Sequence, residues 1–431
     1  MKYFKYLLLV IVVSCSKDEI VPDIDITNPV DCIIDYSTLQ NGINRLTSHY
    51  QPNNIPFTDY ADKLNISLPI FGSYSLFSAY GDFNNNDIPD YAVAATDWRD
   101  TSSNEVVIVI DNQIAFAFSN PQTLTRKISI SDLNEDGIDD IVMFGTGEDV
   151  GNSPGDKTHI IVMGVNSYQL IEVGKNSGYI HTGAVGYING TSNSILEIDS
   201  QAFTKDKEEF VKYYTSDNSI SWNQYETNIS NYYVASTYQS ELYDFDNDGI
   251  LDLILGGHEW EEEWHSSALG FVQWRTNIVG GLGNGQFDID NPIILPSIEN
   301  WGVITDFDMY DIDNDGSTEI IITRTTGRPG VTSVLIDDVF YDGIMVQILK
   351  GNGSNWYEWK RLQQPVAIVG PSLHMVWAYS TLIYDVNKDC LLDIIPESDK
   401  INAKSFTNFN ILRGFYYEQQ TDGSFVIKYK G

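Results

Sequence analysis

A nine-residue phrase occurs five times in this chain and places oxygen-bearing side chains at its positions 1, 3, 5 and 9. The copies are DFNNNDIPD from Asp82, DLNEDGIDD from Asp132, DFDNDGILD from Asp244, DIDNDGSTE from Asp311 and DVNKDCLLD from Asp385. Such oxygens around a tight turn are the ligands that a hard cation such as Ca²⁺ requires. The pattern therefore predicts four or five calcium sites.

Each copy supplies four predicted side-chain ligands, at positions 1, 3, 5 and 9. They are Asp82, Asn84, Asn86 and Asp90; Asp132, Asn134, Asp136 and Asp140; Asp244, Asp246, Asp248 and Asp252; Asp311, Asp313, Asp315 and Glu319; and Asp385, Asn387, Asp389 and Asp393. Below, each loop is named by its first residue, as in "the Asp82 loop".

Position 6 of the phrase calls for a residue that tolerates a positive φ. Three copies have glycine there, whereas the first has Asp87 and the last has Cys390. Aspartate is acceptable and cysteine is unusual at such a position. We therefore expect the Asp82 and Asp385 loops to be the weaker sites.

An EF-hand begins in a similar way but needs a bidentate Glu at position 12 and a helix on each side. Position 12 is instead Val93, Met143, Leu255, Ile322 and Pro396. The residues that follow each copy, such as YAVAA and LILGG, form short and largely apolar runs of strand type. The loops are therefore expected between strands, and an EF-hand is excluded.

The spacing of the copies predicts a β-propeller, because repeats of this length with several short strands each are typical of its blades. The largest gap, from Asp132 to Asp244, is about twice the others and holds NGTSNSILE from Asn189. We interpret it as a decayed sixth copy, with Asn189, Thr191, Asn193 and Glu197 at positions 1, 3, 5 and 9. In the first unit the expected strands are YSLFSAY, DYAVAA, EVVIVI and QIAFAF.

The predicted fold is therefore all-β, with six recognisable four-stranded blades in residues 70–431. Patches such as CIIDY and KLNISLPI within residues 30–69 leave two readings open. Residues 31–69 form either a degenerate seventh blade or a closing segment.

The five loops, together with Phe144-Gly145 and the GLGNGQF turn at 281–287, resemble the FG-GAP or VCBS repeat family. The best-known propeller of that family is the head of integrin alpha subunits. The resemblance spans roughly residues 70–430 and implies calcium, held by the ligands above. A backbone carbonyl at position 7 completes the shell in the family, here from Ile88, Ile138, Ile250, Ser317 and Leu391. The resemblance does not identify a function, because one scaffold of this kind can carry many different functions.

The N-terminus predicts export. Residues 1–14 contain Lys2 and Lys5 followed by the apolar core LLLVIVV, which is too short to span a bilayer as a mature helix. The VVSC ending resembles a lipobox, which would make Cys15 the lipidated first residue; an ordinary secretory signal is the alternative. The acidic SKDE after Cys15 resembles signals that send outer-membrane lipoproteins to the cell surface, and residues 15–30 read as an acidic tether.

Composition agrees with an exported, calcium-rich protein. The formal net charge is −35, and removal of residues 1–14 with two lysines leaves −37. The negative charge of the protein repels nucleic acid, which is therefore excluded as a partner. The protein is expected to bind a membrane only through its lipid anchor. After Cys15 only Cys32 and Cys390 remain, so no disulfide framework is expected, and a link between these two cysteines stays open.

Catalytic signals are few. GNSPG at 151–155 matches the letters of a nucleophile elbow, but Pro154 and a strand follow where a helix is needed. HEWEEEWH at 258–265 is not a zincin motif, because Glu262 stands at the second His position. A solvated hairpin tip is one reading of this segment.

The other interpretation is that HEWEEEWH belongs to a ligand-binding face on the side of the propeller opposite the calcium loops. That face would carry Trp98, Trp260, Trp264 and Arg328, joined by Arg324 and the Glu148-Asp149 pair. Tryptophans beside charges suit sugar stacking or protein capture. The favoured function is a non-catalytic, surface-anchored module that binds glycan or protein. The alternative is a calcium-dependent polysaccharide lyase or glycoside-degrading enzyme, for which no base and cation cluster emerges from spacing.

Overall fold

The computed structural model describes the chain from Ser75 onward, with gaps. The described residues are 75–86, 90–96, 101–111, 113–147, 155–188, 193–199, 211–216, 219–229, 237–257, 259, 275–299, 301–325, 344–363, 367–369, 372–374, 378–385, 387, 389–398 and 415–429. The predictions for residues 1–14, 15–30 and 31–69 lie outside this part of the chain. No helix among these residues is long and apolar enough to cross a membrane.

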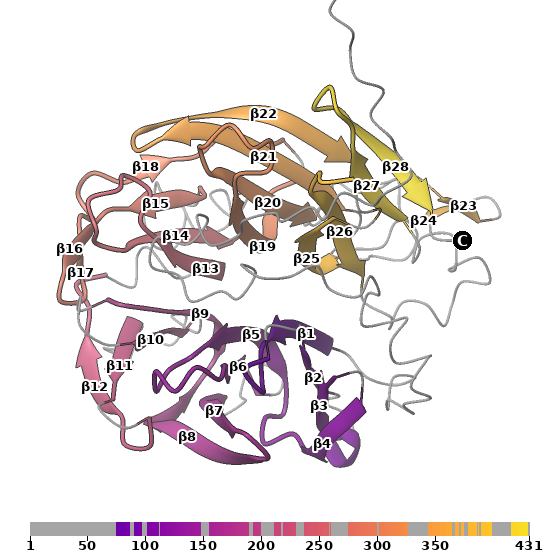
Figure 1. Cartoon of the computed structure of the whole chain (residues 1–431). Coiled ribbons are helices and arrows are strands. Elements are labelled where there is room, and N and C mark those ends of the chain that lie inside the picture. Colours follow the sequence, from indigo (N-terminus) through magenta and orange to yellow (C-terminus); the bar gives the residue numbers. More distant parts are fainter. Residues whose placement is uncertain are drawn as a thin grey trace, which may run out of the picture. The chain divides into compact units, whose positions relative to one another are not determined.

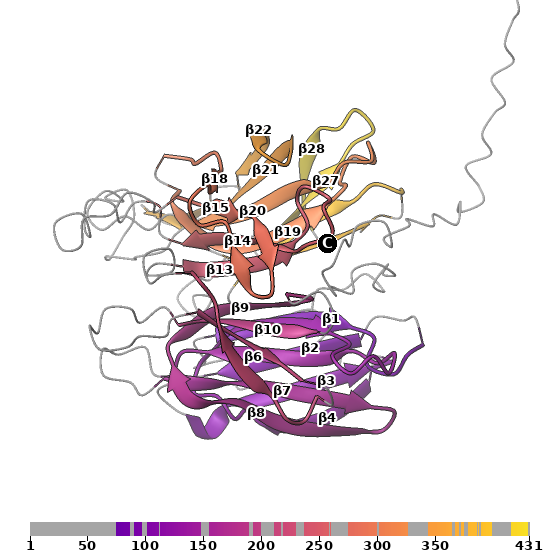
Figure 2. The same ribbon diagram turned by 90° about the vertical axis from the view of Figure 1, so that its left-hand side faces the viewer.

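Six four-stranded antiparallel sheets form a six-bladed β-propeller, as predicted (Figure 1). Blade 1 contains β1 (Ser75–Gly81), β2 (Asp90–Thr96), β3 (Glu105–Ile110) and β4 (Gln113–Ser119), and blade 2 contains β5 (Thr125–Ser131), β6 (Asp140–Gly145), β7 (Asp156–Gly164) and β8 (Ser167–Gly178). Blade 3 contains β9 (Ile180–Gly186), β10 (Ser194–Asp199), β11 (Val211–Thr215) and β12 (Asn223–Glu226). Figure 2 shows β1 to β4 of the first blade one below another.

The second half of the chain repeats this plan. Blade 4 contains β13 (Thr237–Tyr243), β14 (Asp252–Gly257), β15 (Asn277–Val279) and β18 (Ile293–Ile294), and blade 5 contains β19 (Val303–Tyr310), β20 (Glu319–Thr325), β21 (Met345–Asn352) and β22 (Asn355–Gln363). Blade 6 contains β25 (Ala378–Tyr384), β26 (Asp393–Ser398), β27 (Phe415–Gln419) and β28 (Phe425–Tyr429). Two small hairpins, β16 (Gly281–Gly283) with β17 (Gln286–Phe287) and β23 (Ala367–Val369) with β24 (Ser372–His374), and the short 3-10 helix η2 (Thr101–Ser103) complete the described elements.

The core lies between neighbouring blades. Five apolar clusters are buried between blades 1 and 2, 2 and 3, 3 and 4, 4 and 5, and 5 and 6. Second strands such as β6 and β14 are buried along their whole length, since a neighbouring sheet covers each face. Outer strands such as β4 and β12 are largely exposed. The short, β-branched runs that follow the loops therefore fold as inner strands because both their faces must be covered.

The predicted strands of the first unit agree with β1 to β4 to within a residue or two at their ends. The GLGNGQF segment forms the β16–β17 hairpin, with Asn284 and Gly285 at φ values of 53° and 72° in its turn. This pair of positive φ values is what an Asn-Gly hairpin turn requires.

The register assigned to the decayed sixth copy is wrong. In the other blades, position 9 pairs with the residue just before position 1, as Asp252 pairs with Tyr243. In blade 3 the corresponding pair is Gly186 with Ser194, so the loop begins at Tyr187 and is one residue shorter. Glu197 is therefore a buried residue within β10 and not a loop ligand.

Candidate metal centre

The five acidic loops occupy the same place in five blades. Each follows the first strand of its sheet and ends where position 9 begins the second strand, as Asp140 begins β6 and Asp393 begins β26. Because the first and second strands are antiparallel neighbours, the loop is a closed hairpin connection whose ends are fixed by the sheet.

The carboxylate at position 1 organises the turn in the same way each time. In the Asp244 loop, Asp244 Oδ1 accepts a hydrogen bond from the N–H of Asp248 at 3.0 Å, and Oδ2 accepts one from Gly249 at 2.9 Å. The corresponding pairs of bonds occur at Asp132, Asp311 and Asp385. Asp82 accepts from the N–H groups of Asn84 and Asn86 through Oδ1. Aspartate suits position 1 because its short side chain can bond to its own backbone a few residues on.

The backbone is left-handed at two positions of the turn. Position 6 has φ between 85° and 86° at Gly137, Gly249 and Gly316, as the sequence predicted, and 74° at Cys390. Position 4 is left-handed as well, for example at Asn247 with φ 60°, which sequence reasoning missed. Asparagine is common at position 4 of these copies because it tolerates this region better than most residues.

Position 9 anchors the loop to the sheet. In the Asp244 loop, Asp252 Oδ2 accepts a hydrogen bond from Phe245 N–H at 2.9 Å, and Oδ1 accepts one from Gly281 N–H of the third-strand side at 2.7 Å. Asp90 and Asp140 are held by the same two kinds of bond. Burial raises the pKa of Asp90 and Asp140 to about 7 and that of Asp252 to about 6, although the backbone bonds oppose this shift. Position 9 is thus structural in this arrangement, with a lone pair on each oxygen remaining for a cation.

Position 8, which sequence reasoning did not single out, connects neighbouring blades. Asp139 Oδ2 accepts a hydrogen bond from Asp82 N–H at 2.7 Å, and Asp139 N–H donates to Asp82 O at 3.0 Å. The corresponding Asn193 of blade 3 donates from Nδ2 to Asp132 O at 2.7 Å. These bonds link blade 2 to blade 1 and blade 3 to blade 2, whereas the Asp244 and Asp385 loops have Leu251 and Leu392 at position 8.

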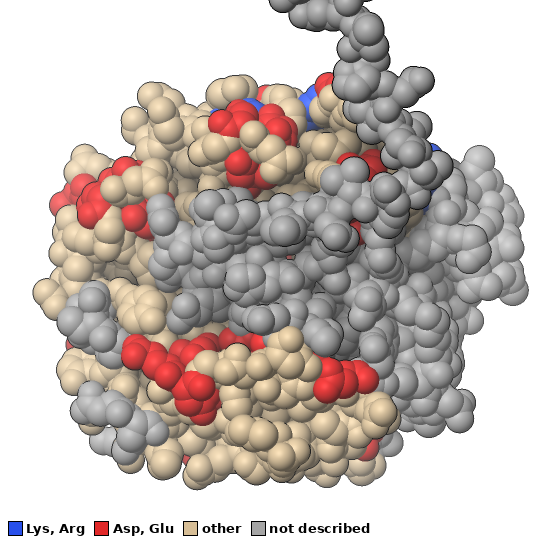
Figure 3. Space-filling view, in the orientation of Figure 1, with Lys and Arg blue, Asp and Glu red and all other residues tan. Residues whose placement is uncertain are grey.

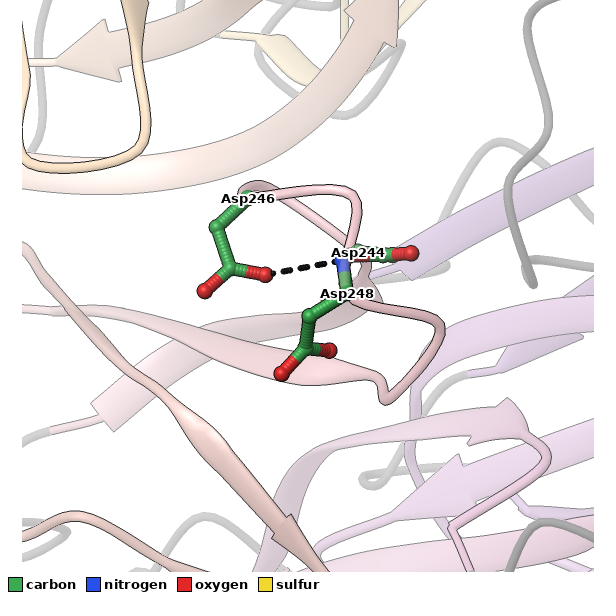
Figure 4. Close-up of side chains that lie close together, drawn as sticks. All are labelled: Asp244, Asp246 and Asp248. Carbon is green, nitrogen blue, oxygen red and sulfur yellow. Dashed lines mark hydrogen bonds between the residues drawn. The ribbon is translucent and has the colours of Figure 1, made fainter.

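Two of the loops, the Asp244 loop and the Asp311 loop, bring three carboxylates close enough together to hold a metal ion. One carboxylate oxygen from each of Asp244, Asp246 and Asp248 lies within 4.8 Å of the others in the Asp244 loop, where all three side chains come from one turn (Figure 4). Asp246 Oδ1 accepts from Asp248 N–H at 3.1 Å, which fixes the turn without using the other oxygens. Three carboxylates this close repel one another unless a cation lies between them. The donor set therefore suits a hard divalent ion.

At positions 1, 3 and 5 the Asp82 loop has a single carboxylate, whereas the Asp244 loop has three. The side chain of Asp111 joins these three positions of the Asp82 loop. Asn84 Nδ2 and Asn86 Nδ2 donate to the two oxygens of Asp111, at 3.1 and 2.8 Å. Asn84 Oδ1 is buried and has no hydrogen-bond partner among the described residues. Asp111, from the β3–β4 turn, thus brings in a carboxylate that the nine-residue phrase does not contain.

The Asp311 loop already contains a cation, the ammonium of Lys350 from β21. Lys350 Nζ lies 2.5 Å from Asp313 Oδ2, 2.7 Å from Asp315 Oδ2 and 3.4 Å from Glu319 Oε1. Burial disfavours the charged ammonium, but hydrogen bonds to Asp313 and Asp315 outweigh it and raise the pKa of Lys350 above its usual value. Lys350 gave no signal in the sequence, because it lies 35 residues from Asp315.

The predicted ligand-face residues Trp98, Trp260, Trp264 and Arg328 lie outside the described residues, as does the Glu148-Asp149 pair. Arg324 is described, and its expected place on that face is wrong. Its side chain is fully buried, with Nη1 2.7 Å from Glu259 Oε2. Its Nε donates to Gln347 Oε1 at 2.8 Å.

Glu259, the second residue of HEWEEEWH, is equally engaged. Its Oε1 accepts from Thr276 Oγ1 at 2.7 Å, and its N–H donates to Gly302 O at 2.8 Å. Glu259 is therefore anchored to blade 5, and the two readings of the rest of the segment concern residues outside the described part of the chain.

The charge of the surface agrees with the composition. Figure 3 shows acidic side chains in several separate groups on the face in view, with basic side chains only at small points near its upper edge. The electric field of such a negatively charged surface attracts cations and repels polyanions.

Cys390, at position 6 of the Asp385 loop, is disulfide-bonded. Both other cysteines, Cys15 and Cys32, lie outside the described residues, so the Cys32–Cys390 link stays a prediction.

Known proteins of similar sequence do not identify a family for this chain. No protein-family model matches the chain, and no curated protein matches it. Among solved structures, an ancestral GH74 enzyme is 11% identical with a TM-score of 0.41, covering 83% of this chain and 38% of its own. The rhamnogalacturonan lyase YesW is 10% identical with a TM-score of 0.39, covering 84% of this chain and 58% of its own. The chain thus spans less than two thirds of either protein, and likeness at this level carries no argument about activity.

Proposed function

We propose that this chain is a calcium-binding propeller of the FG-GAP or VCBS type that acts as a non-catalytic binding module for glycan or protein. The observation that carries the proposal is the repetition of one acidic turn in five blades, with the same pair of backbone bonds to position 1 in four of them and carboxylates gathered at the Asp244 loop. Calcium has a structural part in this account. It neutralises the loops and holds the blades in place.

The binding surface is assigned to the end of the blades opposite the calcium loops. Strands within each blade alternate in direction, so the connections between second and third strands all leave at that end. They range from eight residues after β2 to nineteen after β14 and β20. Trp98, Trp260, Trp264 and Arg328 belong to these connections. Long loops on a rigid scaffold are where binding residues concentrate.

Three of the ionisable groups that the structure describes at this end, Asp156, Glu259 and Arg324, are engaged in structural contacts. Asp156 Oδ2 accepts hydrogen bonds from three backbone N–H groups, those of Thr123, Leu124 and Gly147. Glu259 and Arg324 are paired and buried. A general base must be able to reach a substrate proton, and these groups are instead committed to holding the connections.

The binding face is tested with Trp260→Ala and Trp264→Ala in one protein. We expect binding to be lost on a glycan array or in pull-down with the ligand identified there, while calcium-dependent thermal stability stays at the parent value. Tyr357→Ala is the matched control, because Tyr357 is an exposed aromatic on the outer strand β22. Equal binding by the double variant and its parent would contradict the proposal.

An assay for released or unsaturated sugar products, run on the glycans that bind on the array, distinguishes the non-catalytic binding module from the enzyme alternative. Turnover of a bound polysaccharide would replace the binding-module account with a lyase or hydrolase.

We further propose that the chain is exported and anchored through lipid on Cys15 to the outer membrane at the cell surface. Cys15→Ala is expected to move the protein from the membrane fraction to the soluble fraction. Retention in the membrane fraction would contradict the lipid anchor.

A further inference from the structure

We propose that Lys350 is the resident cation of the Asp311 loop, so that this loop does not take a divalent ion while the other acidic loops do. The inference rests on the proposed calcium role of those other loops. It differs from the sequence-based prediction, which counted the Asp311 loop among four or five calcium sites and expected the Asp82 and Asp385 loops to be the weaker ones.

The contacts of Lys350 are those of a bound cation. Its ammonium has three donors, and three carboxylates, from Asp313, Asp315 and Glu319, surround it at 2.5 to 3.4 Å. The ring of Trp359 lies on Lys350, with 4.5 Å from Nζ to the ring centroid. The side chain is only 13% exposed. A divalent ion would have to displace this ammonium from the oxygens that it needs, against repulsion between like charges.

The Asp244 loop is the matched comparison, because its four ligand positions also carry four carboxylates. In blade 5, Lys350 follows Leu349, which pairs with the residue after position 9, Ile320. In blade 4 the residue at the same register is Gly280, which follows Val279 paired with Leu253. Blade 4 therefore has no side chain where blade 5 has its lysine. No described lysine or arginine forms an ion pair with the carboxylates of the Asp244 loop.

The Asp311 loop keeps the turn that calcium would use. Asp311 accepts the N–H groups of Asp315 and Gly316 at 2.9 and 2.8 Å, as Asp244 does in its own loop. Asp313 Oδ1 is buried and has no hydrogen-bond partner among the described residues. Removal of the lysine should therefore uncover a calcium site with little rebuilding.

The test is the number of Ca²⁺ ions bound per chain, measured by calorimetric titration of wild type and Lys350→Met. We expect the variant to bind one ion more than wild type, and Asp313→Asn in the Lys350→Met background to remove that extra ion. Equal stoichiometry in wild type and Lys350→Met would overturn the proposal. So would a loss of one ion on Asp313→Asn in wild type.

The reciprocal variant Gly280→Lys keeps the proposal testable if Lys350→Met does not fold. A Cβ at Gly280 meets only Asp252 Oδ1, at 3.8 Å, so the substitution is tolerated sterically. We expect it to bind one ion fewer than wild type. An unchanged stoichiometry in a folded Gly280→Lys protein counts against the inference.

Hydrogen exchange separates this inference from the proposed function. In wild type, calcium should slow exchange at the Asp248 and Gly249 amides and leave those of Asp315 and Gly316 unchanged. If wild type binds no calcium at all, the proposed function fails, and a single ion gained by Lys350→Met would still support the role of the lysine. Slowing by calcium at Asp315 and Gly316 in wild type would overturn it.

Discussion

At the residue scale, the side chains at positions 1 and 3 of a loop contribute in different ways. Asp244 accepts the N–H groups of Asp248 and Gly249, and only the first of these has a second acceptor, Asp246 Oδ1, so Asp244 shapes the turn with or without an ion. Asp246 accepts one N–H through Oδ1, and its remaining contribution is negative charge. The two roles can be separated by substitution.

We predict that Asp244→Ala destabilises the protein by about 1–2 kcal/mol even in chelator, because the Gly249 N–H loses its acceptor and the Asp248 N–H keeps only Asp246 Oδ1. Asp246→Asn keeps an acceptor oxygen and removes one of three mutually repelling carboxylates, so it should maintain or raise stability in chelator while it removes one bound calcium. Denaturant unfolding in chelator and in calcium measures both. Equal behaviour of the two variants in chelator would contradict the division of roles.

Glu197 is a residue-scale determinant of pH dependence. It is buried in β10, where burial raises its pKa to about 7, although a hydrogen bond from Thr158 Oγ1 at 2.9 Å opposes the shift. Between its ordinary pKa of about 4.5 and 7, the folded state binds more protons at this group than the unfolded state. The free energy of unfolding therefore falls as pH rises through this window.

Glu197→Gln keeps the shape of the side chain without the titration. We predict that it raises the free energy of unfolding by about 1–3 kcal/mol at pH 8, at ~1.4 kcal/mol per pKa unit, and has little effect near pH 4.5. Urea unfolding at the two pH values is the measurement. A variant less stable than its parent at pH 8 would show that the charged form is the one the fold prefers.

At the element scale, a buried lysine connects three inner strands. Lys127 of β5 donates from Nζ to Gly183 O of β9 at 2.7 Å and to Ser240 O of β13 at 2.5 Å, and it pairs with Glu241 Oε1 at 2.7 Å. Both charged side chains are almost fully buried. First strands of successive blades contribute these groups, so one side chain in blade 2 reaches blade 4.

Lys127→Met is expected to cost about 3–5 kcal/mol, because it leaves the Glu241 carboxylate buried without its counter-charge. Adding Glu241→Gln should recover part of that loss, since it removes the uncompensated charge. The pair of variants is compared by denaturant unfolding. If Lys127→Met costs less than about 1 kcal/mol, the lysine is not a link between the blades.

The strands and the loops of this fold could be predicted from local sequence, and the contacts between them could not. Runs such as YAVAA are predicted as inner strands because their residue types need two covered faces. Glycine at position 6 correctly predicted a positive φ at that position. The register of the blade 3 loop failed because Glu197 offered a carboxylate at the expected spacing, whereas strand pairing placed Ser194 there. Asp111, Lys350 and the Glu259 partner of Arg324 are brought in by sheet pairing and blade packing over tens of residues.

At the scale of the whole molecule, cations and blade order are coupled. Position 8 of the Asp132 loop bonds to position 1 of the neighbouring blade, as Asp139 bonds to Asp82, so ordering of the Asp132 loop supports the interface between blades 1 and 2. The net charge of −35 adds general repulsion that bound calcium reduces. Loss of calcium should therefore destabilise the propeller as a unit.

The most direct test is thermal unfolding in chelator and in millimolar calcium, with magnesium as the control cation. Extracellular sites with dissociation constants of roughly 10⁻⁴ to 10⁻³ M each contribute about 0.6–1.8 kcal/mol at ~2 mM calcium. We predict that several such sites together raise Tm by on the order of 10 °C over the chelated protein, and that magnesium reproduces little of this rise. An unchanged Tm in chelator and calcium would contradict the claim that these loops are calcium sites that stabilise the propeller.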